Sequence, residues 1–510
     1  MTHAKRVLVD FAFWSSSAGM PHVGRAKSKC MGAFWLIIWF VCLACFIYQM
    51  WMIVVQYLSY KVLVQTQLIF KPMPFPSVTV CNLNPYKASR IGKYSELKEL
   101  MSMYVEASKQ TLDESRDKYD LLRTNDSMER LERARDVMEY LVTAYPRSTI
   151  DDISYEVTDM IGSCSFNHLQ CGPNNFTAVY DPIYGRCFKF NTTLTSERAG
   201  PKYGLRLFVI TNVSEYIETS DSLGVRITIT REGDPIFPDS FGHNAQTGFT
   251  TSFALKYLQT TRLPYPYSNC TTPKSGEIYS TEACFRNCLQ AHVAEVCQCQ
   301  DPHSAYVKSL NKPFCDYTKS DCVTAATTAN DSSFDTKACS CPPLCQEGTY
   351  EVAATTSNWP SQAYKKMLCT GRPESDCQYY ADNTMFVELY YEALNYQALS
   401  ESEAYPFEIM ISDIGGDVGL WLGVSVISIV EFIFLPFMLA TTLCNKRVQP
   451  HTTAPSLDER GEQANNEFDR IGGGQPDQDQ LAENVSPDKN TALNPYNDQM
   501  REYHSPPRVQ

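Results

Sequence analysis

Two long apolar runs divide the chain, one near each end. The first covers about residues 31–55 and the second about residues 418–443. A helix needs about 20 apolar residues to cross a bilayer, so both runs predict membrane-spanning helices. A removable signal peptide is the alternative for the first run. Its apolar core is too long for a signal peptide, and no small-residue cleavage site follows it.

The second run is polar along one side, which is unusual for a membrane span. Asp413 and Asp417 stand at its entrance beside Ser412, and Glu431 lies deeper in the run. Ionisable groups at membrane depth are costly, so they face water or a partner. This pattern predicts that the second span lines an ion pathway.

Glycines recur every four residues along the same span, at Gly415, Gly419 and Gly423. Such spacing allows two helices to pack closely. Glycine also allows the backbone to leave helical geometry, which is tolerated at membrane depth where the backbone lines water. Both interpretations hold together in a narrow pore, where carbonyls or hydroxyls near Gly423 replace part of an ion's hydration shell.

The charges that flank the two runs predict the topology. Five basic residues and one acid precede the first run, and two basic residues follow the second. Positive charge favours the cytoplasmic side, so both termini are expected inside and the residues between the runs outside. The expected parts are a cytoplasmic segment (1–30), a first transmembrane helix (31–55), an ectodomain (56–411), a second transmembrane helix (412–443) and a disordered cytoplasmic tail (444–510).

Cysteine usage agrees with an extracellular middle segment. Of the 20 cysteines, 16 fall between Cys81 and Cys377, and an even set in such a segment predicts disulfides. The Cys297–Cys299 and Cys339–Cys341 pairs could instead bind a metal, but no histidine cluster accompanies them. Six sequons suit a glycosylated ectodomain: Asn125, Asn175, Asn191, Asn212, Asn269 and Asn330.

Periodicity places several elements within the ectodomain. Residues 56–64, 206–211 and 225–231 predict strands, whereas residues 93–114, 128–145 and 281–296 predict helices, the last with Thr281 as its N-cap. Cys284 and Cys288 lie on one face of the last helix. Cys339 and Cys341 lie on one face of an extended strand. An antiparallel strand along the helix would pair Cys284 with Cys341 and Cys288 with Cys339, although spacing alone leaves other pairings open.

The net charge of the chain is −13. Acidic residues outside the membrane would draw cations towards its mouth, although a generic solubilising surface explains most of them equally well. No basic, patterned stretch points to nucleic acid. No nucleophile motif, phosphate loop or metal signature indicates an enzyme or a cofactor.

Four motifs, in order, resemble the degenerin/epithelial sodium channel superfamily. They are Phe75-Pro-Ser-Val-Thr-Val-Cys-Asn-Leu-Asn84, Tyr184-Gly-Arg-Cys-Phe-Lys-Phe-Asn191, Ala283-Cys-Phe-Arg-Asn-Cys288 with Cys297-Gln-Cys299, and Asp413-Ile-Gly-Gly416 with Gly423-Val-Ser425. The resemblance covers about residues 14–446. It implies an α+β membrane protein with two transmembrane helices that flank a large, hand-shaped, disulfide-rich ectodomain. It also implies a trimeric plasma-membrane channel for Na⁺, commonly blocked by amiloride.

The resemblance also implies the disulfides and the pore residues. The implied pairs are Cys81–Cys187, Cys164–Cys171, Cys270–Cys345, Cys284–Cys341, Cys288–Cys339, Cys297–Cys322 and Cys299–Cys315, and Cys369 and Cys377, which remain over, are expected to pair. Gly423, Val424 and Ser425 match the selectivity filter, with Ser412, Asp413, Gly416, Gly419 and Glu431 along the pore and gate. Bulky side chains at the position of Ser412 hold such channels open, and the position of Gly419 binds the blocker. The family's His-Gly gating pair matches Ala18-Gly19 here, without the histidine.

What opens the channel is less constrained by sequence. The compact ectodomain is most like FMRFamide-gated and acid-sensing channels, and we favour a short extracellular peptide over protons as the ligand. A constitutively active channel is a third reading. From other classes, an ATP-gated receptor would not be expected to carry the Gly-x-Ser filter. A two-span adhesion receptor would have no reason to place Asp, Gly and Glu along one face of a span.

Overall fold

The computed structural model describes residues 28–192, 194–274, 278–327, 339–371 and 373–444, together with residues 11, 21–22 and 26. The chain divides into two compact units, residues 16–426 and residues 1–15 with 427–510. We describe each unit by itself.

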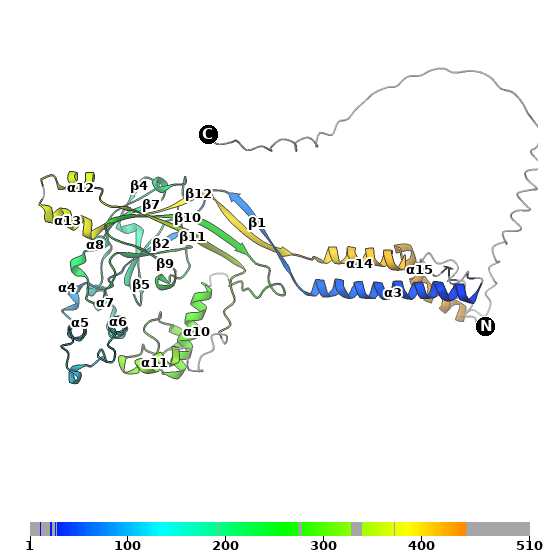
Figure 1. Ribbon diagram of the computed structural model, residues 1–510, viewed down its shortest axis with the longest axis horizontal. Helices are drawn as coiled ribbons and strands as arrows, with labels where there is room; N and C mark the ends of the chain where they lie inside the picture. Colours follow the sequence, from blue (N-terminus) through cyan, green and yellow to red (C-terminus); the bar gives the residue numbers. More distant parts are fainter. Residues whose placement is uncertain are drawn as a thin grey trace, which may run out of the picture. The chain divides into compact units, whose positions relative to one another are not determined.

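Two β-sheets, which we call the palm, lie at the centre of the larger unit (Figure 1). The first sheet has the order β11-β10-β12-β7-β3-β4, with β1 also paired to β12, and the second has the order β5-β6-β2-β8-β9. The strands are β1 (Val62–Phe70), β2 (Ser77–Asn82), β3 (Ile161–Phe166), β4 (Leu169–Cys171), β5 (Phe176–Asp181), β6 (Gly185–Phe190), β7 (Leu205–Ile210), β8 (Val225–Thr230), β9 (Gly242–Ala245), β10 (Phe249–Thr261), β11 (Gln346–Asn358) and β12 (Thr384–Glu403).

The alternation of side chains along β12 explains how the palm is held together. Met385, Val387, Leu389 and Tyr391 are buried, as expected for every second residue of a strand with one buried face. They join buried residues of the second sheet in one apolar core. Between them, Glu388 accepts a hydrogen bond from Ser252 Oγ at 2.9 Å.

The finger is a group of helices that has its own core. It consists of α4 (Ala88–Ile91), α5 (Ser95–Ser108), α6 (Ser127–Thr143) and α7 (Arg147–Ile153). Leu97, Leu100 and Met101 recur at helical spacing on α5 and are buried against Val137 and Met138 of α6. The apolar stripes predicted within residues 93–145 therefore pack on each other.

The thumb, residues 262–345, is built around α10 (Thr281–Val296) and α11 (Ser320–Thr327). Only three residues of α10 are buried, namely Gln290, Val293 and Ala294. Five disulfides hold the thumb instead: Cys270–Cys345, Cys284–Cys341, Cys288–Cys339, Cys297–Cys322 and Cys299–Cys315. The remaining helices of the ectodomain are α8 (Val157–Met160), α9 (Pro238–Phe241), α12 (Gln362–Cys369) and α13 (Glu374–Asn383).

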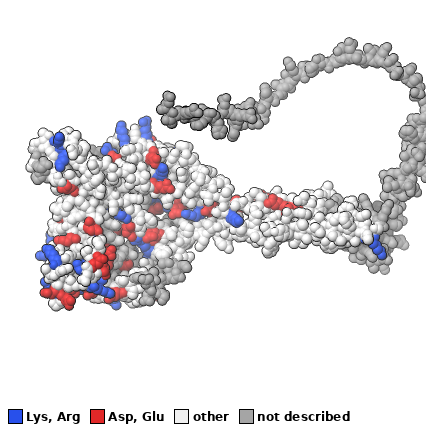
Figure 2. All heavy atoms as spheres, in the orientation of Figure 1, with Lys and Arg blue, Asp and Glu red and all other residues white. Residues whose placement is uncertain are grey.

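Two strands of the palm continue into helices. Helix α3 (Lys29–Leu58) leads into β1, and β12 leads into α14 (Phe407–Leu422) (Figure 1). No residue of α3 is buried, and large apolar side chains such as Trp51 are exposed on it. Charged side chains are scattered over the ectodomain but are sparse along these helices (Figure 2). Beyond Lys29, α3 carries no charged residue, and its length matches the interior of a bilayer.

The smaller unit contains α15 (Val426–Cys444). Within it, the ring of Phe11 lies 5.4 Å from that of Phe432. By length and hydropathy, α3 alone among the described helices can cross a membrane, and α14 with α15 provides a second span only when the two are counted as one broken helix.

Several elements differ from the sequence prediction. Residues 56–58 belong to α3, which Ser59 caps, so the predicted strand at 56–64 begins only at Val62. Ser280, not Thr281, is the N-cap of α10, because its side chain accepts a hydrogen bond from Ala283 N at 3.0 Å. Helix α14 begins at Phe407, before the expected start of the second span at residue 412.

The segment with Cys339 and Cys341 also differs from the sequence prediction. Cys339 and Cys341 lie in a tight turn and not in a strand, because Cys341 N donates to Cys339 O at 3.0 Å. They nevertheless pair with Cys288 and Cys284. Cys339 and Cys341 therefore still bond to Cys288 and Cys284 of α10, although they do not form a strand.

Candidate functional site

Helix α14 contacts α3 along one face. The ring of Phe407 lies 6.4 Å from that of Tyr57, and Trp421 Nε1 donates a hydrogen bond to Gln49 Oε1. Phe407 and Trp421 are 14 residues apart, about four helical turns. The face that they define is the one that packs on α3.

The opposite face of α14 carries small side chains. Ser412, Gly416, Gly419 and Gly423 follow one another at spacings of four, three and four residues. At 100° per residue they fall on one stripe, about half a turn from Trp421. Ser412, Gly416 and Gly419 are exposed, and no described atom lies within 4 Å of a Cβ built on either glycine. Within this unit, the stripe therefore faces outward and leaves room for water or for a further helix.

The stripe ends at a break in the helix. Gly423 has φ 57° and ψ 31°, a left-handed conformation that ends α14. Gly423 N donates to Gly419 O at 3.1 Å, the single hydrogen bond of an αL C-cap, and Val424 N donates to Val418 O at 3.4 Å. Such an end leaves other carbonyls of the last turn without partners within the helix. Any residue with a Cβ would strain this position by about 1–2 kcal/mol.

The predicted pore residues fall on both sides of this break. Gly423, Val424 and Ser425 form the connection between α14 and α15, while Asp413 lies exposed on α14 and accepts a hydrogen bond from the Tyr405 hydroxyl. Glu431 is half-buried on α15, in the other unit. Ala18 and Gly19 lie outside the described residues.

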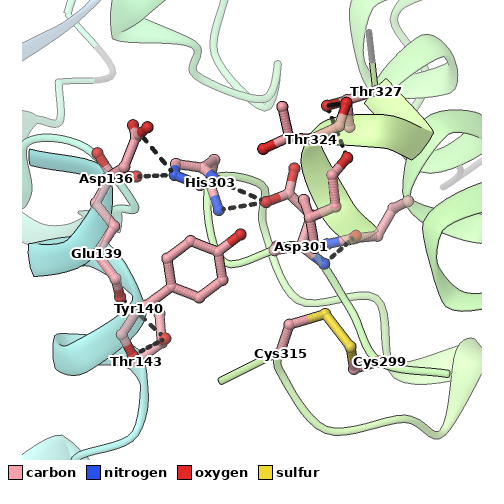
Figure 3. A network of polar contacts seen from close by, with 12 residues as sticks. Asp136, Glu139, Tyr140, Thr143, Cys299, Asp301, His303, Cys315, Thr324 and Thr327 are labelled. Carbon is pink, nitrogen blue, oxygen red and sulfur yellow. Dashed lines mark hydrogen bonds and ion pairs between the residues drawn. A yellow bond between two sulfur atoms is a disulfide. The ribbon is translucent and has the colours of Figure 1, made fainter. Parts of the chain in front are cut away.

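A second cluster of polar residues joins the finger to the thumb (Figure 3). The His303 ring of the thumb points towards α6 of the finger, where its Nε2 lies 3.6 Å from Asp136 Oδ1 and 3.8 Å from Glu139 Oε2. Its Nδ1 lies 2.7 Å from Asp301 Oδ1. The ring of Tyr140 stacks edge-on against the imidazole at 5.3 Å. One imidazole thus contacts three carboxylates from two parts of the ectodomain.

This arrangement controls where the groups titrate. Burial lowers the pKa of His303, but its contacts with Asp136, Asp301 and Glu139 outweigh burial and raise that pKa to about 10. Burial raises the pKa of Glu139 to about 8, although the charge of His303 lowers it. At neutral pH both residues therefore hold a proton, and His303 is the cation of the contact.

The seven disulfides that the resemblance implies are present, including Cys81–Cys187 and Cys164–Cys171 outside the thumb. Cys369 and Cys377, which remained over, are also paired. Among the sequons, Asn125, Asn175, Asn191 and Asn269 are exposed and Asn212 is half-buried. Asn330 lies outside the described residues. No group of three metal-binding side chains occurs within the part of the chain that the structure describes.

Comparison with known proteins identifies the family. The description "Amiloride-sensitive sodium channel" matches residues 11–435. The chain belongs to the amiloride-sensitive sodium channel family. This confirms the resemblance, which had placed the chain in the superfamily of degenerins and epithelial sodium channels.

Proteins similar to this chain include nematode degenerins. Degenerin-like protein asic-2 of Caenorhabditis elegans is 30% identical over 475 residues, which cover 85% of this chain and 86% of that protein. Degenerin-like protein asic-1 of the same organism is 38% identical over 62% of this chain and 40% of its own length. The chain thus spans less than half the length of some relatives. A solved structure, of a proton-activated chloride channel, matches with a TM-score of only 0.31 at 7% identity, over 79% of this chain and 97% of that chain.

The sequence did not predict the finger–thumb cluster. Glu139 and His303 are far apart in sequence and belong to no motif. The available signal was weak. An isolated histidine follows Asp301 by two residues, directly after the cysteine-rich stretch, and helix α6 carries acids at helical spacing on the same face.

Proposed function

We propose that this chain forms a trimeric, sodium-selective, amiloride-sensitive channel of the plasma membrane that a short extracellular peptide opens. Both termini would be cytoplasmic, and the subunits would be copies of this chain. Family membership supports the ion and the blocker.

The break at Gly423 is the observation that carries the pore proposal. Three copies of α14, with their small-residue stripes turned inward, would leave a narrow water-lined path. The left-handed Gly423 ends the helix where that path would be narrowest. Carbonyls or hydroxyls of residues 423–425 would then replace part of the hydration shell of Na⁺. Glu431, further along, would add a ring of negative charge that excludes anions.

The finger–thumb cluster gives no support to protons as the ligand. In an acid-gated channel, groups that link moving parts should gain a proton between about pH 7 and pH 5. Here His303, with a pKa of about 10, and Glu139, with a pKa of about 8, hold their protons before acidification begins. Acid would leave the charges of these two groups unchanged.

Voltage-clamp of cells that express this chain alone tests the proposal. We expect Phe-Met-Arg-Phe-amide to evoke an inward Na⁺ current that amiloride blocks, with no current at pH 5. A current at pH 5 without a peptide response would favour an acid-sensing channel. An amiloride-sensitive current before any addition would favour a constitutive one, and silence under all conditions would contradict a peptide-gated homotrimer.

A pore variant separates the conduction path from the ligand. Glu431→Gln should lower single-channel conductance or Na⁺ over K⁺ selectivity while the peptide concentration for half-maximal current stays the same. Glu408→Gln, at the outer start of α14, is the matched control and should change neither. Unchanged reversal potential and single-channel current in Glu431→Gln would remove this residue from the pore.

A further inference from the structure

One side-chain hydrogen bond joins α3 to α14, and it lies within the apolar run of α3. Trp421 Nε1 donates to Gln49 Oε1, and within the described residues of these two helices no other side-chain hydrogen bond links them. Both side chains are half-buried. Gln49 lies about 14 Å along α3 from its end at Leu58. A polar side chain is costly inside a bilayer, and residues of this kind are commonly functional there.

The geometry of the two helices explains why these two side chains meet. Tyr57 and Phe407 mark one end of the contact, with ring centroids 6.4 Å apart. From that end Gln49 lies about 12 Å back along α3, whereas Trp421 lies about 21 Å onward along α14. Side chains of a helix lean towards its N-terminus, so in antiparallel helices these two lean towards each other and close the difference. The bond therefore sets the height of α14 against α3.

Trp421 belongs to the last turn of α14, directly before the break. Leu422 is the last residue of the helix, and the left-handed Gly423 follows it. Gly419, whose carbonyl accepts from Gly423 N at 3.1 Å, belongs to the same turn. Trp421 points about half a turn away from the small-residue stripe, so α3 holds this turn from the side opposite the stripe. A bond to Trp421 restrains the turn from which residues 423–425 continue.

Apolar contacts alone would hold this turn loosely. In lipid an apolar side chain gains little by facing another helix, since the lipid tails are equally apolar. A hydrogen bond, in contrast, acts only over a narrow range of distance and angle. The bond between Gln49 and Trp421 therefore supplies a positional constraint that the apolar residues around it cannot.

We propose that Gln49 is a positioning residue of the selectivity filter, and that its hydrogen bond to Trp421 fixes the rotation and height of the last turn of α14. This inference rests on the pore proposed above and adds to it a residue of α3 that touches no permeating ion. Without the bond the turn shifts. The three copies of residues 423–425 then no longer hold their oxygens at one distance from the axis, and Na⁺ and K⁺ are distinguished less well.

The test measures the reversal potential of the peptide-evoked, amiloride-sensitive current with Na⁺ on one side of the membrane and K⁺ on the other. This potential does not depend on the number of channels, so a variant that is merely less abundant leaves it unchanged. Gln49→Met keeps the length of the side chain but removes the acceptor. The Na⁺ over K⁺ permeability ratio should fall about threefold, the factor that corresponds to an average hydrogen bond between membrane helices. Trp421→Phe, which removes the donor, should cause a similar fall.

A double variant and two controls separate positioning from packing. Gln49→Met combined with Trp421→Phe leaves neither partner unsatisfied, so it should lower the ratio no further than either change alone. Gln49→Glu retains an acceptor oxygen and should keep most of the wild-type ratio. Gln56→Met is the matched control and should leave the ratio unchanged. Gln56 lies two turns along α3, and its exposed side chain makes no hydrogen bond to α14 within the described residues.

The outcomes distinguish this role from the pore itself. An unchanged permeability ratio in both Gln49→Met and Trp421→Phe would overturn the positioning role and leave the pore intact. A double variant whose loss is the product of the two single losses would overturn it as well. Where Gln49→Met fails to reach the cell surface, Trp421→Phe and Gln49→Glu still decide. A wild-type current that is absent or not selective for Na⁺ would overturn the proposed pore, and this role with it.

Discussion

The finger and the thumb are both helical, yet they are stabilised in different ways. The finger has no cysteine between Cys81 and Cys164, and its helices bury a continuous cluster that includes Leu97, Leu100 and Val137. The thumb has one long helix with three buried residues and five disulfides. Two amphipathic helices of the finger bury an extended core between them, whereas α10 and the short α11 of the thumb share only a small cluster that includes Val293 and Val323, so the thumb depends more on covalent links. This strategy is available only in an oxidising compartment.

The largest expected effect comes from removing two disulfides of the thumb, Cys284–Cys341 and Cys288–Cys339. Replacing Cys284, Cys288, Cys339 and Cys341 by Ser should destabilise the thumb by about 2–4 kcal/mol, the range typical of one disulfide, because Cys270–Cys345 still closes a larger loop around both removed pairs. Proteolysis of the surface-expressed channel would detect this as new cleavage in the thumb. Removing only Cys288–Cys339 should cost well under half as much, since Cys284–Cys341 closes nearly the same loop. Equal effects of the single and double removal would contradict the entropic explanation.

Truncating the finger core should have the next largest effect. Leu100 is fully buried, and Leu100→Ala should lower the free energy of unfolding of the finger by about 3 kcal/mol through a cavity. A mild reductant should cause no further loss of stability in the finger of this variant, because the finger contains no disulfide. The same reductant should destabilise the thumb of the wild type. Hydrogen exchange of solubilised channel, compared in the two regions, makes the measurement. Protection lost in the finger on reduction would break the distinction between the two regions.

The contact between the two regions should depend on pH. Folded His303 keeps its proton to about pH 10, whereas an unfolded histidine loses it near pH 6.5. Folded Glu139 keeps its proton to about pH 8, whereas an unfolded glutamate loses it near pH 4.5. Both groups therefore stabilise the contact at low pH, and this stability is lost as the pH rises, for His303 between about 6.5 and 10. Thermal unfolding of His303→Gln should begin lower than that of wild type at pH 6.5, and the gap should narrow by pH 10. Parallel curves at all pH values would show that His303 does not link the regions.

The smallest effect concerns the helix N-caps. Asp126 caps α6 by accepting from Met128 N at 2.9 Å, as Ser280 caps α10. Asp126→Ala should cost about 1 kcal/mol. Ser280→Ala should cost less, because the Cys284–Cys341 disulfide already holds the first turn of α10. Melting of the purified channel with each variant gives the comparison, and a larger loss for Ser280→Ala would contradict it.

The sequence predicted what depends on local pattern. Apolar spacing located α5, α6 and α10, and cysteine spacing on α10 favoured two rungs of the thumb. The sequence did not predict the tight turn at Cys339–Cys341, because that backbone geometry depends on the disulfide partners on α10. Helix α14 begins at Phe407, five residues before the expected start of the second span, and Phe407 contacts Tyr57 of α3 there. Gly423 was recognised as a place where the backbone can leave the helix, but its left-handed conformation is a tertiary property.

The contact of His303 with Glu139 shows the same limit more clearly. Neither residue stands in a motif, and the pKa of each depends on groups brought near by folding. The sequence shows acidic residues in the ectodomain but not which of them face another charge.

The pairing of β1 with β12 has a mechanical consequence. All nine residues of β1, from Val62 to Phe70, are aligned antiparallel with Asn395 to Glu403, and these strands continue into α3 and α14. A pull along such strands loads the interstrand hydrogen bonds in shear, so that they resist together and do not open one at a time like a zipper. Force applied to the palm would therefore reach both α3 and α14 at once, and the paired strands would behave as a stiff rod and not as a hinge.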